Sequence, residues 1–306
     1  TYSLNIFLGI VNIFLIFLIC NRLGFSFFTS VLSGTTFAFA TFSFTYSGTF
    51  TQHHGVTLFL LLTYLLYLKK VTSLNSFLFG LFFGLGIFMD IPFAVISLPI
   101  LISFFTKYIN LQKLPDFRKI VDFRFLLSGI SLTAVGSLLM LYNTNTTGNP
   151  LLLAQSVGRN FDFIGIPADS TTSQPPPRSL FSTYKSRYLM QGLHTLVLSR
   201  ERSLFYYSPV LTIALMGIII LYFKDTNTKD EKKTLLTPAT ASIILTVTSY
   251  SMFGDPWGGW SFGPRYLIPA AAMLCLFIPY AIQTYVKSTI FSFVFISLLI
   301  VSVFIN

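Results

Sequence analysis

The loop FGDPWGGWSFGPRY, residues 253–266, combines an acid, a cation and stiff aromatic side chains between two long apolar runs. A carboxylate at Asp255 and a guanidinium at Arg265 could grip a hydroxyl and an anionic headgroup at a membrane surface. The tryptophan and tyrosine side chains of the loop are Trp257, Trp260 and Tyr266. The alternative is an interfacial turn, in which these rings anchor the chain and Arg265 snorkels from a helix end. The loop alone leaves both interpretations open.

Acids in the loops that we assign below to the outer side are further candidates, because ionisable groups near membrane depth are costly and mark functional sites. These acids are Asp90, Asp162, Asp169, Glu201 and Asp255. Asp90 lies in the sequence MDIP, where Pro92 fixes a turn, so Asp90 either caps the following helix or acts on a substrate. The remaining acids lie among lysines and are typical of solvated loops.

His53 and His54 end the loop YSGTFTQHHG. Successive residues on a helix point about 100° apart, so the two rings are poorly placed to share one metal. We expect an imidazole to bind a phosphate or a sugar hydroxyl, or to be an interfacial polar group. Without an acid at ligand spacing, a structural zinc site is not expected. No cofactor is implied, and the sequence leaves open whether a divalent metal binds.

The elements that position these residues are apolar helices. The chain has 306 residues, of which 53% are hydrophobic and 10% charged, so its apolar runs must lie in lipid. Basic residues form small groups beside these runs, as orientation signals and headgroup contacts do, which argues against a nucleic-acid partner and for membrane lipid. The sequence predicts an all-α integral membrane protein in which residues 1–306 form a single transmembrane domain.

Apolar runs of about the length that a helix needs to cross a bilayer predict about ten transmembrane helices. We place them at 2–20, 26–44, 55–68, 75–88, 92–106, 125–142, 204–223, 234–252, 266–283 and 288–305. Two of them, 75–88 and 92–106, are short, and one kinked helix is the alternative. The positive-inside rule favours a hairpin with its outer turn at Met89–Pro92, because two spans keep the basic groups on either side of them in the cytoplasm. The first span then starts outside.

A long segment, residues 143–203, falls on the outer side. It contains the spacer QPPPR and then SLFSTYKSRYLMQGL, residues 179–193, which predicts an amphipathic helix lying on the membrane. Lys185 and Arg187 would reach headgroups from this helix. A lid over a site is the other interpretation of the same segment.

The order of landmarks resembles the polytopic glycosyltransferases of the GT-C type, in particular the protein mannosyltransferase and aminoarabinose transferase groups. The matching stretches are NRLGFS, YSGTFTQHHG, GLGIFMDIP, LYNTNTTGNPL, SRERSLFYYSPVL and DPWGGWSFGPRYLIPA. The resemblance implies a GT-C-like fold and a sugar donor carried on a polyprenyl phosphate. It also implies transfer on the outer face with inversion at the anomeric carbon.

In this resemblance Asp90 and Asp255 are the candidate catalytic acids, and Arg265, with Arg187 and Lys185 in reserve, binds the donor phosphate. The other substrate-binding candidates are His53, His54, Trp257, Trp260 and Tyr266. The family keeps its principal acidic motif after a helix that precedes the stretches matched here. The chain opens at Thr1 without Met and ends at Asn306 inside an apolar stretch, so we expect a sequence cut at both ends. In the resemblance it starts at the family's second span, so we expect the acidic motif to lie upstream, which would make Asp90 and Asp255 supporting residues.

Two other classes of function stay open. A lipid or sugar translocator should carry polar residues along a path through several spans, whereas here polar character gathers in the outer loops. A noncatalytic membrane subunit would need no acidic loop upstream. In each case we expect a multi-pass protein of a prokaryotic cell membrane.

Overall fold

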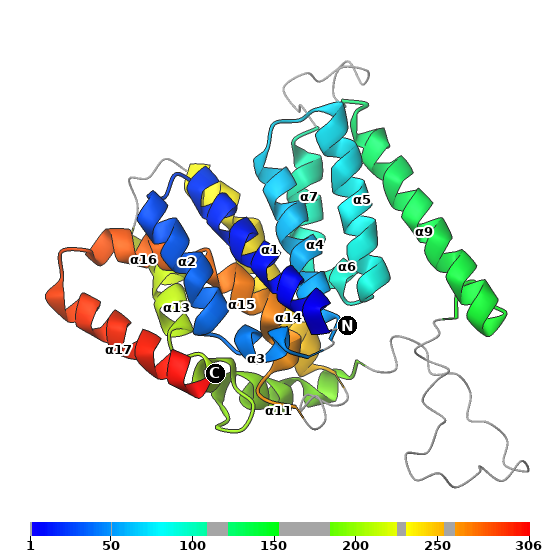
Figure 1. The fold of residues 1–306 in the computed structure, drawn as a ribbon. Coiled ribbons are helices and arrows are strands. Elements are labelled where there is room, and N and C mark those ends of the chain that lie inside the picture. The colour runs from blue at the N-terminus through cyan, green and yellow to red at the C-terminus, as the bar shows by residue number, and fades with distance from the viewer. Residues whose placement is uncertain (1, 50, 109–121, 153–183, 225–230, 254–260) are drawn as a thin grey trace, which may run out of the picture.

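The computed structural model describes residues 2–49, 51–108, 122–152, 184–224, 231–253 and 261–306. Every named element within these ranges is a helix, and one isolated bridge joins Tyr184 to Phe253. The all-α prediction is therefore confirmed for the described residues. Figure 1 shows the helices as a bundle in which most elements run between two common ends.

The helices of the first half are α1 (Tyr2–Arg22), α2 (Phe27–Phe39), α3 (Ser43–Ser47), α4 (His53–Leu68), α5 (Ser73–Met89), α6 (Phe93–Ile96), α7 (Leu98–Thr106) and α9 (Phe125–Thr147). Those of the second half are η4 (Ser186–Tyr188), α11 (Leu189–Leu193), η5 (His194–Leu198), α12 (Leu204–Tyr207), α13 (Leu211–Ile219), η6 (Ile220–Lys224), α14 (Glu231–Ser251), η7 (Arg265–Leu267), α15 (Ile268–Cys275), α16 (Ile278–Tyr285) and α17 (Thr289–Ile305). All the predicted apolar segments coincide with one or more of these helices.

Three helical stretches are long and apolar enough to cross a membrane: Ser3–Arg22, Phe125–Thr147 and Arg265–Tyr285. The described residues are thus consistent with a membrane protein. Other apolar segments form shorter helices or are divided, as 26–44 is divided between α2 and α3. About ten crossings therefore stay a prediction.

The doubtful pair of apolar segments forms two helices. α5 ends at Met89 and α6 begins at Phe93, so the chain turns at Asp90–Pro92, and the hairpin rather than the kinked helix is confirmed. Gly86 permits the tight turn, because a Cβ there would lie 2.5 Å from the Phe93 ring. Phe79 and Phe104 then stack with ring centroids 3.6 Å apart.

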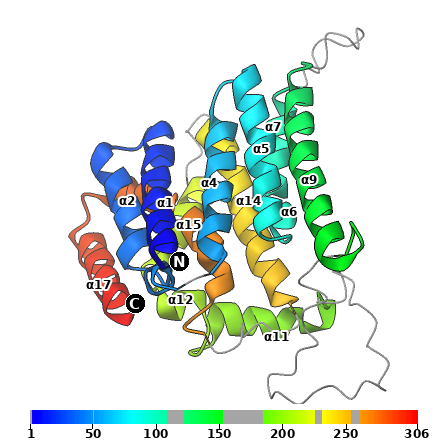
Figure 2. The same cartoon turned by 45° about the vertical axis from the view of Figure 1, so that its right-hand side comes forward.

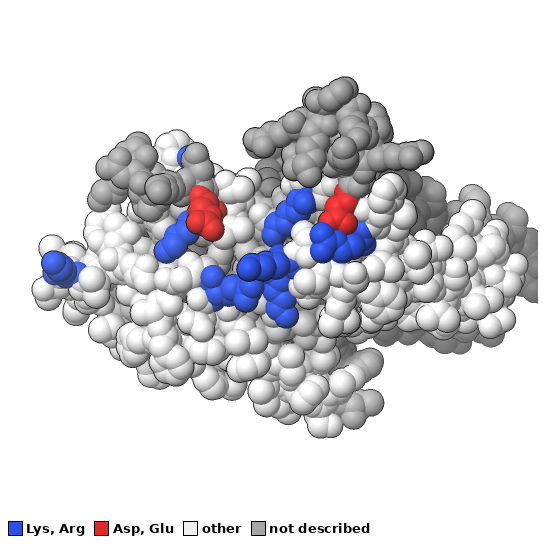
Figure 3. Space-filling model, turned by 90° about the horizontal axis from the view of Figure 1, so that it is seen from above, with Lys and Arg blue, Asp and Glu red and all other residues white. Residues whose placement is uncertain are grey.

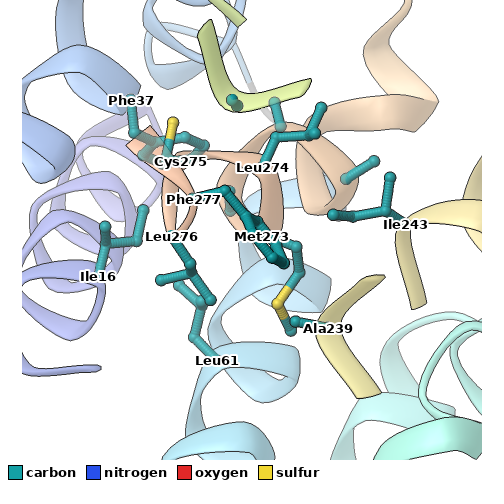
Figure 4. Close-up of a cluster of buried hydrophobic side chains, with 14 of the residues drawn as sticks. Ile16, Phe37, Leu61, Ala239, Ile243, Met273, Leu274, Cys275, Leu276 and Phe277 are labelled. Carbon is teal, nitrogen blue, oxygen red and sulfur yellow. The ribbon is translucent and has the colours of Figure 1, made fainter. Parts of the chain in front are cut away.

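α15 lies at the centre of the bundle, and all of its residues are buried. Figure 4 shows its side chains and those just after it meeting residues from α1, α2, α4 and α14. These residues are Ile16, Phe37, Leu61, Ala239, Ile243, Met273, Leu274, Cys275, Leu276 and Phe277. In lipid there is little hydrophobic force between helices, so such contacts stabilise the bundle mainly through close packing. The run Ala270–Ala272 provides the small residues that this packing needs.

Glycines let α5 and α9 approach each other closely. A Cβ at Gly80 would lie 2.0 Å from the Ser128 carbonyl oxygen, and one at Gly84 would lie 2.9 Å from Val135 Cβ. This spacing is the small-xxx-small pattern of membrane helix pairs. The Ser131 hydroxyl adds a hydrogen bond of 2.8 Å to the Phe77 carbonyl.

One end of the bundle carries the described basic residues that we expect in the cytoplasm, and we call this the basic end. α1, α4, α7 and α16 end there, and α2, α5, α9, α14 and α17 begin there (Figure 1). Three of the helices that begin there are capped by side chains that accept a backbone N–H, at Ser26, Thr72 and Ser288. The described basic groups thus share one end as expected, and the membrane side that this end faces stays a prediction.

The opposite end holds α3, α11 and α12, and we call it the aromatic end. Figure 2 shows α11 lying across this end, beneath the ends of α4, α14 and α15. Gly192 makes the close approach to α14, since a Cβ there would lie 2.0 Å from the Ser251 carbonyl oxygen.

The predicted interfacial helix needs correction. Residues 179–183 lie outside the described ranges, Tyr184 and Lys185 are extended rather than helical, and the helix runs from Ser186 to Leu198. The Lys185 N–H donates to the Met252 carbonyl at 2.8 Å, so pairing with the segment after α14 replaces a first helical turn.

Candidate functional site

Asp90 lies at the turn between α5 and α6, at the aromatic end. Its backbone is extended, with φ −159° and ψ 121°. The hydroxyl of Tyr250, near the end of α14, donates to its carboxylate at 3.3 Å. The N-cap of α6 is Pro92, and no side chain caps that helix, so the capping role considered for Asp90 is not what the structure shows.

Burial raises the pKa of Asp90 to about 6, and the hydrogen bond from Tyr250 partly opposes this shift. The charged form is disfavoured because the surrounding protein replaces water that would solvate it. Half of the carboxyl groups are therefore ionised slightly below neutral pH, as suits a group that takes up and releases protons.

An aromatic cluster joins Asp90 to the other candidates, and we define it as Tyr184, Tyr250, Phe253 and Tyr266. Tyr250 and Tyr266 are stacked, with ring centroids 5.0 Å apart and planes 7° apart. Phe253 meets Tyr266 at 5.5 Å and Tyr184 at 5.7 Å. Burial, with Asp90 and Tyr266 nearby, raises the pKa of Tyr184 to about 12, so its hydroxyl remains a hydrogen-bond donor.

Arg265 lies against this cluster at the start of η7, which leads into the central helix α15. Its guanidinium carbon is 5.3 Å from the Tyr266 ring centroid, a distance typical of a cation on an aromatic face. Among the described residues its Nε atom is buried and has no hydrogen-bond partner. A buried donor without a partner costs free energy, and an anionic ligand would satisfy it.

A second arginine shapes the approach to Arg265. Arg202 Nη1 donates to Ser261 Oγ at 3.2 Å and to the Gly263 carbonyl at 3.4 Å. Gly263 has φ +60°, a left-handed conformation that favours glycine, and the Tyr46 hydroxyl donates to the neighbouring Phe262 carbonyl at 2.7 Å. These contacts fix the turn that orients Arg265.

Of the two histidines, one borders the cluster. The His53 ring meets Tyr266 edge-on at 5.4 Å and interacts electrostatically with Arg265, while its buried Nδ1 lacks a partner among the described residues. His54 is fully buried against α1, where a Cβ at Gly9 would lie 3.8 Å from its ring. Asn12 Nδ2 donates to the His54 carbonyl at 3.0 Å, so His54 serves the α1–α4 contact.

The two reserve cations differ in their relation to the cluster. Lys185 follows Tyr184, whose backbone pairs with Phe253, and is therefore adjacent to the cluster. Arg187 is exposed and folds onto Tyr188, to whose hydroxyl it donates at 3.0 Å. Lys185 Nζ lies 5.9 Å from the centroid of the Tyr188 ring, so both reserve cations lie against Tyr188.

The remaining candidates of the loop, Asp255, Trp257 and Trp260, lie outside the described residues. In the part of the chain that the structure describes, no three His, Cys, Asp or Glu side chains gather around a common point. The divalent metal left open by the sequence therefore has no ligand set among those residues.

Sequence reasoning had named Asp90, His53, Arg265 and Tyr266 but missed Tyr250, which links Asp90 to the others. Comparison with known proteins adds no assignment, since no protein-family model, curated protein or solved structure matches this chain. The site offers a carboxylate with a pKa of about 6, a guanidinium with a buried donor that lacks a partner among the described residues, and a stacked tyrosine pair in contact with both.

Proposed function

We propose that the aromatic end is the site of a membrane glycosyltransferase of GT-C type, which moves a sugar from a polyprenyl phosphate to an acceptor hydroxyl with inversion. One observation carries the proposal. Asp90 contacts Tyr250, Tyr250 stacks on Tyr266, and Arg265 lies on Tyr266, so a stacked pair of rings separates an acid from a cation. Inverting transfer needs a base and a leaving-group cation on opposite sides of one sugar.

Asp90 acts on the acceptor in this scheme. Its carboxylate takes the proton of the acceptor hydroxyl as the oxygen attacks the anomeric carbon. The glycosidic oxygen–carbon bond forms while the bond from that carbon to the phosphate oxygen breaks, and the lipid phosphate leaves with the electron pair. A pKa of about 6 leaves most Asp90 side chains ionised at neutral pH, ready to accept the proton.

Arg265 stabilises the leaving phosphate. A guanidinium is permanently charged and offers donors in a planar fork that matches two phosphate oxygens. The unpaired Nε of Arg265 and the unpaired Nδ1 of His53 supply further contacts at the same place.

Four buried threonine hydroxyls in the helices favour chemistry at the end of the bundle over a transport path. Thr36, Thr57, Thr63 and Thr246 each donate to a backbone carbonyl one turn earlier in their own helix. Groups satisfied in this way offer few contacts to a passing substrate. A translocator stays the second candidate, because the buried Ser242 Oγ and Asn12 Oδ1 have no partner among the described residues.

The test is sugar transfer from polyprenyl-phosphate donors by the intact protein in proteoliposomes. We expect Asp90→Asn to reduce the transfer rate by about 10² to 10⁴, the contribution of a general base. Arg265→Ala should reduce it by about one to two decades, and Arg265→Lys should recover only part of that, because it keeps charge but loses the fork.

Asp122→Asn and Arg124→Gln are the matched controls, since they change the same residue types at the basic end. Folded yield is measured for each variant. If Asp90→Asn and Arg265→Ala transfer sugar at the wild-type rate, the site is an aromatic-anchored turn. If the wild-type protein transfers no sugar but its presence activates a second protein, the noncatalytic subunit is the correct interpretation.

A further inference from the structure

The basic end carries much more positive than negative charge. Its described basic side chains are Arg22, Lys69, Lys70, Lys107, Arg124, Lys232, Lys233 and Lys287. Its described acids are Asp122, which is already paired with Arg124, and Glu231. Figure 3 looks onto this end, where the blue Lys and Arg side chains gather across the centre and outnumber the red acids. Such a surface attracts anions.

Three of these cations lie at the ends of neighbouring helices, and we call Arg22, at the end of α1, Lys107, after α7, and Lys232, at the start of α14, the junction cations. Arg22 Nε donates to the Leu68 carbonyl at 3.4 Å, and Lys107 Nζ donates to the Tyr67 carbonyl. Lys232 Nζ lies 4.9 Å from the centroid of the Phe25 ring, in the α1–α2 turn. Arg22 and Lys107 therefore lie at the end of α4, and Lys232 lies beside the α1–α2 turn that follows Arg22.

Tyrosines hold this junction together. The Tyr64 hydroxyl donates to the Leu235 carbonyl at 2.8 Å, and the Tyr67 hydroxyl donates to the Thr234 carbonyl at 3.4 Å. Both bonds tie the end of α4 to the start of α14. The helix ends that carry Lys107 and Lys232 are thus held beside the end of α4.

Helix capping accounts for part of this arrangement only. Cations favour the carbonyl end of a helix, and Arg22 and Lys107 both lie at the end of α4. However, burial and the nearby Arg22 lower the pKa of Lys107, so these like charges disfavour each other. An anion shared between them would remove that cost, since opposite charge favours the ionised form.

Exposed apolar side chains flank the basic turns. They are Phe27, Phe28, Leu74, Phe123, Phe223 and Ile290, with exposed fractions from 63% for Phe123 to 82% for Phe223. Each lies within a few residues of a Lys or Arg of the basic end. Positive charge beside exposed apolar side chains matches the boundary between a lipid headgroup and its acyl chains.

We infer that the junction cations bind the phosphate of an anionic diacyl phospholipid in the leaflet that borders the basic end, with its acyl chains along the neighbouring apolar side chains. A lipid is favoured over a soluble anion because the junction cations lie at the ends of apolar helices, at the end of the bundle where exposed apolar side chains also lie. The inference does not depend on the proposed sugar transfer, which takes place at the other end.

The test is native mass spectrometry of the full chain in mild detergent with equal amounts of phosphatidylglycerol and phosphatidylcholine. We expect phosphatidylglycerol to be retained preferentially, and each junction cation changed to Gln should reduce its binding about five-fold at low salt, the effect of one Lys or Arg near an anionic surface. Lys232→Gln is the variant that leaves the hydrogen bonds to α4 intact. Lys107→Arg should retain binding.

Lys287→Gln is the control on the same end, because Lys287 lies in the α16–α17 turn and outside the junction. Equal retention of the two lipids would overturn the inference, as would a loss of binding with Lys287→Gln equal to that with Lys232→Gln. Competition by glycerol phosphate at millimolar concentration would also overturn it, since the site would then recognise a soluble anion.

Discussion

The two ends of the bundle use the same cationic side chains in different settings. At the basic end, Arg22 and Lys107 bind helix carbonyls, and the only described ion pair nearby, Asp122 with Arg124, is exposed. At the aromatic end, Arg265 lies on a tyrosine, its Nε is buried, and the nearby Asp90 is neither exposed nor ion-paired among the described residues. The charges at the basic end suit attraction to an anionic membrane surface. The charges at the aromatic end suit chemistry on one bound substrate.

The difference lies in desolvation. An exposed charge interacts through high dielectric and is screened by salt, so its effect is broad and additive. A buried acid next to aromatic rings has a shifted pKa and acts at a defined distance. If this comparison is correct, substitutions at the aromatic end should change rates and pH profiles, and those at the basic end should change lipid binding.

The largest expected effect comes from separating α11 from α14. Gly192→Val places side-chain atoms where the Ser251 carbonyl already lies, so α11 must move away and take the Tyr184–Phe253 pairing with it. Misplacement of about 1 Å costs roughly a hundredfold in rate. We expect sugar transfer to fall by at least that factor while phosphatidylglycerol retention at the basic end stays at the wild-type level.

Gly136→Val is the control for this change, because a Cβ at Gly136, on α9, meets no atom within 4 Å. It should leave both transfer and lipid retention unaltered. If Gly192→Val abolishes lipid retention as well, the two ends do not behave as separate functional regions.

A medium effect is expected at Tyr250, which touches Asp90 but donates no group to the reaction. Its hydrogen bond lowers the pKa of Asp90, so Tyr250→Phe should raise that pKa by about one unit. The transfer rate requires ionised Asp90, and the rate should therefore decline at a pH about one unit higher in the variant. The measurement is the rate as a function of pH, and a lower rate with an unchanged pH profile would show that Tyr250 serves packing alone.

The sequence was informative where local pattern decides structure. Apolar runs predicted the helices, and MDIP predicted the turn that separates α5 from α6, because Pro92 has no N–H to continue a helix. Charge placed the basic groups at a common end. Asp90 and Arg265 were also identified, since an acid and an arginine beside apolar runs are unusual.

What sequence pattern could not reveal was long-range contact. Tyr250 lies in the run SYSMF, where its ring looks like ordinary core, and its bond to Asp90 joins residues 160 positions apart. The interfacial helix was placed too early because Tyr184 and Lys185 have helix-compatible neighbours, yet the chain after α14 offers them backbone pairing instead. Arg202 lies in the stretch SRERSLFYY, which resembles the family, but nothing in that stretch indicated that Arg202 binds the turn before Arg265.

The smallest expected effect is on the free energy of unfolding, which we compare for variants of Asp90 and Asp122. Asp90 has a native pKa of about 6, against about 3.9 in an unfolded chain, so the folded protein holds that proton more tightly. Stability therefore falls as pH rises from about 4 to 6 and stays lower above it. Asp90→Asn removes this loss, and we expect it to raise the free energy of unfolding at pH 7.5 by about 1 to 2 kcal/mol, allowing for partial exposure, while leaving pH 4 unchanged.

Asp122 should behave in the opposite way. Its hydrogen bond with Arg124 lowers its pKa, so its contribution favours folding above the unfolded pKa and is lost as the pH falls. Because the pair is exposed, Asp122→Asn should leave unfolding at neutral pH unchanged within error at physiological salt. Thermal unfolding of both variants at pH 4 and 7.5 decides the matter. If Asp90→Asn is destabilised at pH 7.5, the Asp90 carboxylate stabilises the fold. The proposed difference between a reactive aromatic end and a lipid-binding basic end would then lack its catalytic acid.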